Sequence, residues 1–161
     1  SKFHWKYNVL NYGFNYRLSD INSALGISQL KKINFFLKKR KKIYEYYKTN
    51  LKNYKNLIYF PKYNKKNKPS YHLVLININF KNFRKNKDIF LKYLYKNNII
   101  SQFHYIPIYN FKTFKSKKKK LKNSEEYHAS TLSIPIYHSL KNKDQNLIIN
   151  VIKKFFKYSK N

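Results

Sequence analysis

The fold is decided most clearly by one stretch of the sequence, Gly13-Phe14-Asn15-Tyr16-Arg17-Leu18-Ser19-Asp20-Ile21. Ser19 is a suitable N-cap, because its side-chain oxygen can accept a hydrogen bond from an amide of the first helical turn. Gly13 can adopt a left-handed or crowded backbone that other residues resist. Asn15 and Arg17 are two positions apart, so in an extended chain they point the same way and can bind an anionic oxygen together. From spacing alone, the better interpretation is that Asn15 binds the backbone of its loop and that Arg17 forms an ion pair at the surface.

Lysine dominates the charge of the chain. Its 161 residues include 36 Lys and Arg against 6 Asp and Glu, a formal net charge of +30. Such an excess is typical of nucleic-acid-binding proteins, but bidentate phosphate contacts favour arginine, and only Arg17, Arg40 and Arg84 are arginines. Residues with A/T-rich codons are abundant, so we interpret the lysines as a solvated surface shaped by an A/T-rich genome. The residues that resist this drift mark constrained positions: Gly13, Arg17, Ala24, Gly26, Pro107, Ala129 and Pro135.

Several classes of site are excluded. The chain has no cysteine, which rules out disulfides, thiolate metal sites and cysteine nucleophiles. His4, His72, His128 and His138 lack metal-ligand spacing, so no metal site is predicted. The sequence contains no apolar run of about 18 residues, which argues against a membrane span. Its N-terminus has no basic-then-apolar signal pattern, so a cytoplasmic protein is expected.

Hydrophobic periodicity predicts a mixed α/β layer, in which helices pack over a small sheet. Helices are expected from Ser19 onward and over 34–50, 87–97, 125–131 and 143–158, the fourth capped by Ser124. Strands are expected over 70–80, 99–103 and 132–137. Residues 53–69 and the lysine-dense tract 112–123 are predicted to be exposed connections.

Three segments match the sequence motifs of one protein family, in the same order as in that family. Residues 12–32 are similar to the motif G-Y-N-Y-R-[LM]-[ST]-[DE]-I-x-A-A-L-G-x-x-Q-L, with Phe14 and Ser23 as mild departures. Residues 101–109 are similar to Q-V-H-Y-x-P-[IL]-[HY], and residues 124–135 to A-E-x-x-x-x-x-x-L-S-L-P. By these motifs the chain resembles the DegT/DnrJ/EryC1/StrS family of sugar-nucleotide aminotransferases. The ordered spacing is more specific than any one motif.

The resemblance implies the C-terminal small domain of a fold-type I transferase that depends on pyridoxal 5'-phosphate (PLP). Residues 1–33 would be the end of the large domain with an interface helix, and residues 34–161 the small domain. The enzyme would be a homodimer with composite active sites. Asn15 would reach the cofactor phosphate of the partner subunit, Arg17 would line that site, and His104 and Tyr105 would face the nucleotide sugar.

The resemblance also implies a reaction. Family members aminate a keto group of a nucleotide sugar, usually with L-glutamate as donor. The motif sequences are most similar to those of members that make a UDP-linked 4-amino-4,6-dideoxy sugar for pseudaminic acid. No specific nucleic-acid partner and no membrane partner are implied.

One part of the family's chemistry has no counterpart in these residues. Amino transfer requires a lysine that binds the cofactor covalently and an aspartate paired with its pyridine nitrogen. In the family both precede the first motif, and none of the lysines here lies in a cofactor motif. We therefore assign no catalytic residue and expect this chain to be inactive alone. Two alternatives are a lysine-rich module that binds nucleic acid or an anionic surface, and a truncated remnant that folds poorly.

Overall fold

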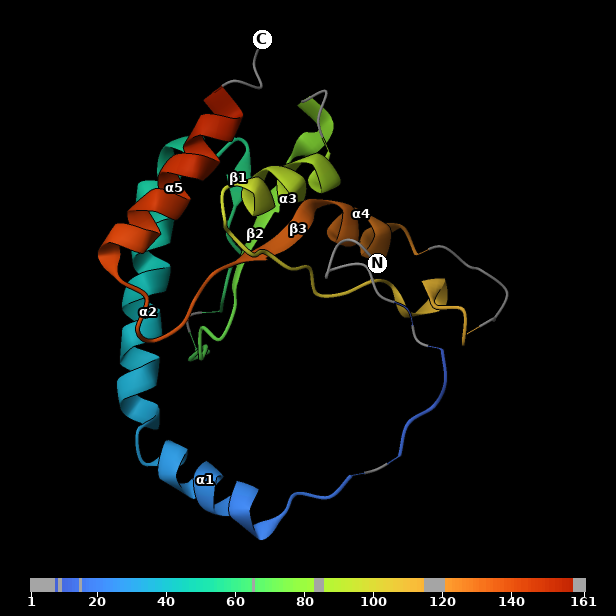
Figure 1. Cartoon of the computed structure of the whole chain (residues 1–161). Coiled ribbons are helices and arrows are strands. Elements are labelled where there is room, and N and C mark those ends of the chain that lie inside the picture. The colour runs from blue at the N-terminus through green and yellow to red at the C-terminus, as the bar shows by residue number, and fades with distance from the viewer. Residues whose placement is uncertain are drawn as a thin grey trace.

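A three-stranded antiparallel sheet organises the chain (Figure 1). The computed structural model describes residues 8, 10–14, 16–64, 66–82, 86–114 and 121–157. The strands are β1 (Ile58–Tyr59), β2 (Val74–Ile78) and β3 (Thr131–Ile134), in the order β1-β2-β3. Central β2 places Ile76 opposite Leu132 of β3, and Ile78 opposite Ile58 of β1.

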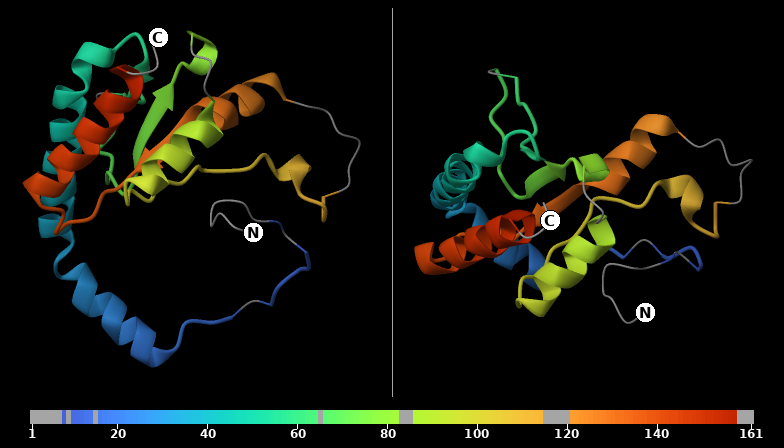
Figure 2. Two further views of the ribbon diagram at one scale, coloured as in Figure 1. Left: turned by 45° about the horizontal axis from the view of Figure 1, so that its top comes forward. Right: turned by 90° about the horizontal axis from the view of Figure 1, so that it is seen from above.

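One face of the sheet carries the hydrophobic core. Val74, Ile76 and Ile78 alternate along β2 and are fully buried, because successive strand residues point to opposite faces. They form one cluster with buried residues of α2 (Ile33–Asn50), α3 (Lys87–Lys96) and α5 (Asn142–Lys157). Figures 1 and 2 show these three helices gathered beside the sheet. Among the described residues, short 3-10 turns connect the larger elements: η1 (Lys52–Tyr54), η2 (Phe80–Asn82) and η3 (Ile108–Asn110).

The opposite face of the sheet lies next to α4 (Lys122–Ser130), which contacts both β2 and β3. Leu75 and Asn77 point to this face and are half-buried. The Asn77 side-chain amide donates to Thr131 Oγ1 over 3.0 Å, which ties the end of β2 to the start of β3.

Helix α3 begins and ends with local signals that position the segment after it. Asn86 caps its start, since its side-chain oxygen accepts from the Ile89 amide at 3.0 Å. Asn98 follows the helix in the left-handed region, at φ 58°, which asparagine tolerates better than most residues. The turn lets the Ile99 amide donate to the Leu94 carbonyl at 2.9 Å, and Ile99 enters the core.

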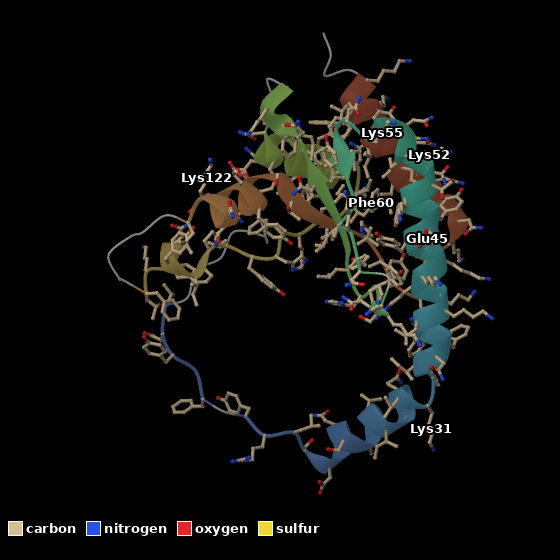
Figure 3. All side chains as sticks on the ribbon, turned by 180° about the vertical axis from the view of Figure 1, so that it is seen from behind. Lys31, Glu45, Lys52, Lys55, Phe60 and Lys122 are labelled. Carbon is tan, nitrogen blue, oxygen red and sulfur yellow. The ribbon has the colours of Figure 1, made fainter. Side chains whose placement is uncertain are left out.

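The N-terminal arm, by which we mean residues 10–30, stands apart from the rest. It contains an extended segment and α1 (Asp20–Leu30), none of whose residues is buried. Ser19 caps this helix, with its Oγ accepting from the Asn22 amide at 3.4 Å. Figure 3 shows the arm's side chains clear of the helices and sheet.

Most predicted elements are present, with three corrections. Strand β1 lies inside 53–69, which was predicted to be only a connection. Residues 99–103 form no strand, only an isolated bridge between Gln102 and Ser133. Helix α4 begins at Lys122 rather than after Ser124, so Ser124 lies within the helix and does not cap it. No helix in the described ranges is long and apolar enough to cross a membrane.

Candidate functional site

The described residues between Gly13 and Ser19 are exposed and belong to no helix or strand, and Asp20 and Ile21 begin α1. Gly13 has no positive φ, and a Cβ built on it would meet nothing within 4 Å. The expectation that Gly13 adopts a left-handed or crowded backbone is therefore wrong for this chain. Asn15 lies outside the described residues. Arg17 is exposed and makes no hydrogen bond or ion pair with any described residue.

This exposure bears on the fit to a cofactor phosphate. A guanidinium without a protein partner offers its donors to an anion, and its planar fork suits phosphate oxygens. Arg17 thus has the chemistry that a phosphate site needs. Its proposed partner Asn15 and the large-domain residues that would complete such a site are not among those described. The placement of Asn15 and Arg17 at the cofactor stays a prediction.

His104 and Tyr105 lie on a segment held against β3. The Ser133 amide donates to the Gln102 carbonyl at 2.6 Å, and Ser133 Oγ lies 2.9 Å from His104 Nε2. Burial, with His72 as a smaller cause, lowers the pKa of His104 below its usual value, so the ring is neutral at pH 7. Its Nδ1 is buried and has no hydrogen-bond partner among the described residues.

The side chains of His104 and Tyr105 differ in their exposure and in their contacts. The ring of Tyr105 lies edge-on to His104, with centroids 4.9 Å apart. Tyr105 is 66% exposed, whereas His104 is half-buried and bound to Ser133. Tyr105 is therefore the residue available to a ligand, and His104 packs against its ring. That either residue faces a nucleotide sugar stays a prediction.

A shallow cavity of about 380 Å³ adjoins Tyr105. Its wall is formed by residues of the same segment and of the start of α4: Tyr105, Ile106, Pro107, Asn123, Ser124 and Tyr127. This volume is at the lower end of the range for small-molecule sites. Pro107 was singled out in the sequence because it resists the compositional drift, and it lies here in a buried position.

Glu125 links the segments that carry the second and third motifs. Tyr109 Oη donates to Glu125 Oε1 at 2.8 Å, and Asn110 Nδ2 lies 3.4 Å from the same oxygen. The carboxylate therefore ties η3 to the first turns of α4. One motif supplies the tyrosine and the next supplies the acid, so this hydrogen bond joins the two segments.

Lys87 was not singled out in the sequence, yet it supports the same segment. It is 7% exposed, its Nζ donates to the His128 carbonyl, and its ammonium lies 4.5 Å from the ring centroid of Phe103. Burial lowers the pKa of Lys87 to about 8, an effect that neighbouring Asp88 partly opposes. Its amino group is closed in by these contacts and lines none of the cavities described here, so it does not fit a lysine that binds a cofactor.

The two halves of the predicted site are not joined within one chain. No hydrogen bond or ion pair between described residues links Arg17 to His104 or Tyr105. No cluster of three or more His, Asp or Glu that could hold a metal occurs in the described part of the chain. What one chain presents is thus an exposed arginine on the arm, and a supported tyrosine beside a shallow cavity.

Known proteins share both the sequence and the shape of this arrangement. A 34% identical relative from Helicobacter pylori is a UDP-4-amino-4,6-dideoxy-N-acetyl-beta-L-altrosamine transaminase; the match covers 91% of this chain and 40% of that protein. The transaminase of that name from Campylobacter jejuni is 32% identical over 89% of this chain and 38% of its own. The chain therefore spans about two fifths of the length of these relatives.

A solved structure agrees with them. Helicobacter pylori PseC, an aminotransferase involved in the biosynthesis of pseudoaminic acid, superposes with a TM-score of 0.80 at 31% identity, over 98% of this chain and 43% of that one. An aminotransferase from Streptoalloteichus hindustanus, TlmJ, has the same fold with a TM-score of 0.79 at 19% identity. The profile of the DegT/DnrJ/EryC1/StrS aminotransferases matches residues 2–153, and the chain belongs to that family.

Proposed function

We propose that this chain serves in the transfer of an amino group from L-glutamate to the keto group of a UDP-linked sugar, giving a 4-amino-4,6-dideoxy sugar. The observation that carries this proposal is the ordered set of three motifs, together with relatives that are transaminases of such a sugar at 32% and 34% identity. The same observation favours the aminotransferase over a lysine-rich module that binds nucleic acid.

The proposal gives each described feature a role. Amino transfer in the family depends on PLP, which when bound would accept the amino group of the donor and pass it to the keto group of the acceptor. Arg17, with Asn15, binds the phosphate of the cofactor held by the partner subunit of a homodimer. Tyr105 contacts the nucleotide sugar, and His104 fixes the orientation of Tyr105. Residues 1–33 belong to the large domain and its interface, and residues 34–161 form the small domain.

Neutral His104 suits a positioning role. A ring that stays uncharged at pH 7 keeps one nitrogen bound to Ser133 and adds no further charge beside the substrate. Tyr105, by contrast, can donate a hydrogen bond from an exposed hydroxyl. Removing that hydroxyl leaves the ring contact with His104 in place, so the two functions can be separated by substitution.

A chimera tests the proposal. Residues 1–161 replace the matching C-terminal part of the Helicobacter pylori transaminase, and formation of the UDP-linked amino sugar from its 4-keto precursor and L-glutamate is measured. We expect activity, a fall in kcat/KM of roughly 10-fold for Tyr105→Phe from one lost hydrogen bond, and weaker PLP retention for Arg17→Lys. The isolated 161-residue chain is expected to be inactive.

The control is the unmodified Helicobacter pylori enzyme in the same assay. Tyr95→Phe serves as a matched substitution, since Tyr95 is an exposed tyrosine on α3 outside the cavity beside Tyr105. A chimera that is dimeric and retains PLP, yet aminates no UDP-linked keto sugar, contradicts the proposal. So does a Tyr105→Phe chimera with undiminished kcat/KM.

A further inference from the structure

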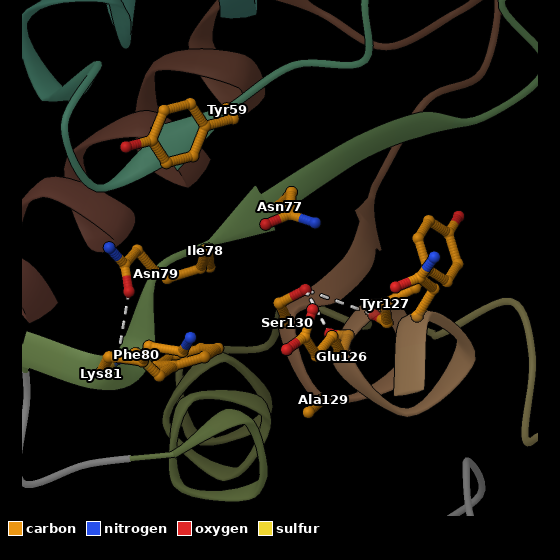
Figure 4. Close-up of a pocket in the computed structure, with 11 residues that line it drawn as sticks. Tyr59, Asn77, Ile78, Asn79, Phe80, Lys81, Glu126, Tyr127, Ala129 and Ser130 are labelled. Carbon is orange, nitrogen blue, oxygen red and sulfur yellow. Dashed lines mark hydrogen bonds between the residues drawn. The ribbon is translucent and has the colours of Figure 1, made fainter. Parts of the chain in front are cut away.

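A second and larger cavity adjoins α4 where the sheet ends. Its volume is about 540 Å³, within the range of small-molecule sites. The lining comes from β1, β2, η2 and α4: Tyr59, Asn77, Ile78, Asn79, Phe80, Lys81, Asn123, Glu126, Tyr127, Ala129 and Ser130. Figure 4 shows Tyr59 and Tyr127 at opposite ends, with Asn77 between them. We call this cavity the α4 cavity.

The α4 cavity presents a hydrogen-bond donor and an acceptor on neighbouring amides. Asn77 uses its Nδ2 to bind Thr131 Oγ1, which leaves its side-chain oxygen as an acceptor. Asn79 uses its side-chain oxygen to accept from the Lys81 amide at 3.2 Å, which leaves its Nδ2 as a donor. Asn77 of β2 and Asn79, directly after it, both line the cavity. Together they can bind a ligand's hydroxyl groups, each of which both donates and accepts.

The charges around the α4 cavity are balanced, although the chain as a whole carries +30. Lys81 and Glu126 are its charged lining residues, one of each sign. A different cavity between α2 and the start of α5 is lined by Lys39, Lys42 and Lys141, with no acidic residue. An anion would be drawn to the lysine-lined cavity, and the α4 cavity favours a neutral ligand.

Two kinds of surface complete the α4 cavity. Tyr59 and Tyr127 are half-exposed, so parts of their ring faces are open to a ligand's apolar C–H groups. Ala129 is one of only two alanines in a chain whose composition disfavours alanine. It lines the cavity, so a larger side chain at this position is expected to reduce the cavity's volume.

We propose that the α4 cavity is a binding site for the ring of a neutral sugar. The sugar's hydroxyl groups pair with Asn77, Asn79 and Glu126, and its C–H faces pack on the tyrosine rings. The site is separate from the cavity beside Tyr105, although Asn123 and Tyr127 of α4 contribute to both. The proposal does not depend on the proposed function, because it rests on the shape and chemistry of this cavity alone.

Nuclear magnetic resonance titration of the 161-residue chain tests the site directly. The probe is methyl β-D-glucopyranoside, followed through the side-chain amides of Asn77 and Asn79 and the methyl group of Ala129. We expect saturable shifts of these signals. Inorganic phosphate and uridine are expected to leave them unchanged. The proposal is overturned if the sugar causes no saturable shift, or if phosphate or uridine causes the same one.

Matched alanine substitutions locate the effect. Ala129→Leu fills the α4 cavity and should weaken sugar binding by at least about 10-fold, whereas Ala24→Leu, at the chain's other alanine on α1, should leave it unchanged. Both alanines occupy exposed helical positions, so both variants keep the fold. Tyr127→Ala removes one aromatic wall and should weaken binding by a similar factor. Unchanged binding in both Ala129→Leu and Tyr127→Ala also overturns the proposal.

Discussion

Helices α1 and α5 lie at opposite ends of the chain, and both carry apolar residues at helical spacing. Helix α5 buries one side completely, with Ile148, Ile152 and Phe155 in the core. Helix α1 buries nothing: Ile21 is 83% exposed and Leu25 is 58% exposed. The same kind of pattern therefore yields a packed helix at one end and a bare one at the other, because periodicity specifies an apolar face but not its partner.

The unburied region around α1 is also the one whose sequence matches the family motif most specifically. Residues 12–32 match the family motif at most positions, yet contacts among the described residues do not explain why these residue types are present. An apolar surface of this extent is characteristic of an interaction site. The composite site of a homodimer, as proposed above, gives the arm a partner. Paired substitutions in the packed core and in exposed α1 test this difference.

The largest effect is expected in the central strand. Ile76→Ala removes a fully buried side chain from β2 and should lower the free energy of unfolding by about 3–4 kcal/mol, from lost burial and the cavity left behind. Ile21→Ala makes the same change on exposed α1 and should alter it by less than about 0.5 kcal/mol. Urea unfolding followed by circular dichroism measures both. Equal effects would show that α1 packs as firmly as the core.

A second test concerns the charge inside the packed region. The pKa of Lys87 is about 8 in the folded chain, against 10.5 for a lysine in water, so the unfolded chain binds more protons between these values. The stability cost of the buried charge is therefore fully present below about pH 8 and is relieved as pH rises. Relative to Lys87→Met, the wild type should gain roughly 1–2 kcal/mol between about pH 8 and about pH 9.5.

Urea unfolding of both proteins across this range measures the gain. Burial raises the pKa of Tyr44 to about 12, but Tyr44 is present in both proteins, so its effect cancels in the comparison. Lys92→Met is the matched control, since Lys92 is an exposed lysine on the same helix. Parallel pH profiles for the wild type and Lys87→Met would contradict the burial of this charge.

A third and smaller effect is expected where a hydroxyl group is buried. Tyr47 Oη donates to the Pro135 carbonyl at 3.0 Å, and this residue is fully buried. Tyr47→Phe leaves that carbonyl without its partner and should cost about 1–2 kcal/mol of unfolding free energy. Tyr46 binds Asn146 Oδ1 at 2.6 Å in an exposed setting, so Tyr46→Phe should cost about half as much or less. The reverse ranking in thermal or urea unfolding would show that water, not Pro135, satisfies Tyr47.

The sequence was sufficient for the long elements and insufficient for the short ones. The helix over 34–50 and the strand within 70–80 were predicted because many residues share one period. Strand β1 has only Ile58 and Tyr59, too few to show alternation, and it exists because it pairs with β2. In α5 both Leu147 and Ile149 are apolar, yet Leu147 is 52% exposed and Ile149 is buried. Which side of an apolar helix faces inward depends on the neighbouring helices.

The candidate site shows a similar division. His104 and Tyr105 were predicted only through the family motif, since one histidine beside one tyrosine has no distinctive spacing. The structure adds that Tyr105 is exposed and His104 is bound to Ser133. Lys87 could not be predicted from the sequence, because a single lysine carries no signal in a chain this rich in lysine. Its burial results from the meeting of α3, α4 and the segment at Phe103.

The smallest effect is expected at the cap of α1, and it separates local from global stability. Ser19→Ala removes the acceptor of the Asn22 amide, which weakens the helix by about 1 kcal/mol. Since no residue of α1 is buried, this loss should appear as faster hydrogen exchange of α1 amides, with the urea midpoint unchanged. Asn86→Ala removes the equivalent cap from packed α3 and should lower the midpoint. If Ser19→Ala also lowered the midpoint, the arm would be coupled to the core through a second copy of the chain, since no residue of α1 is buried within one copy. The difference between α1 and α5 would then be one of assembly rather than of packing within the chain.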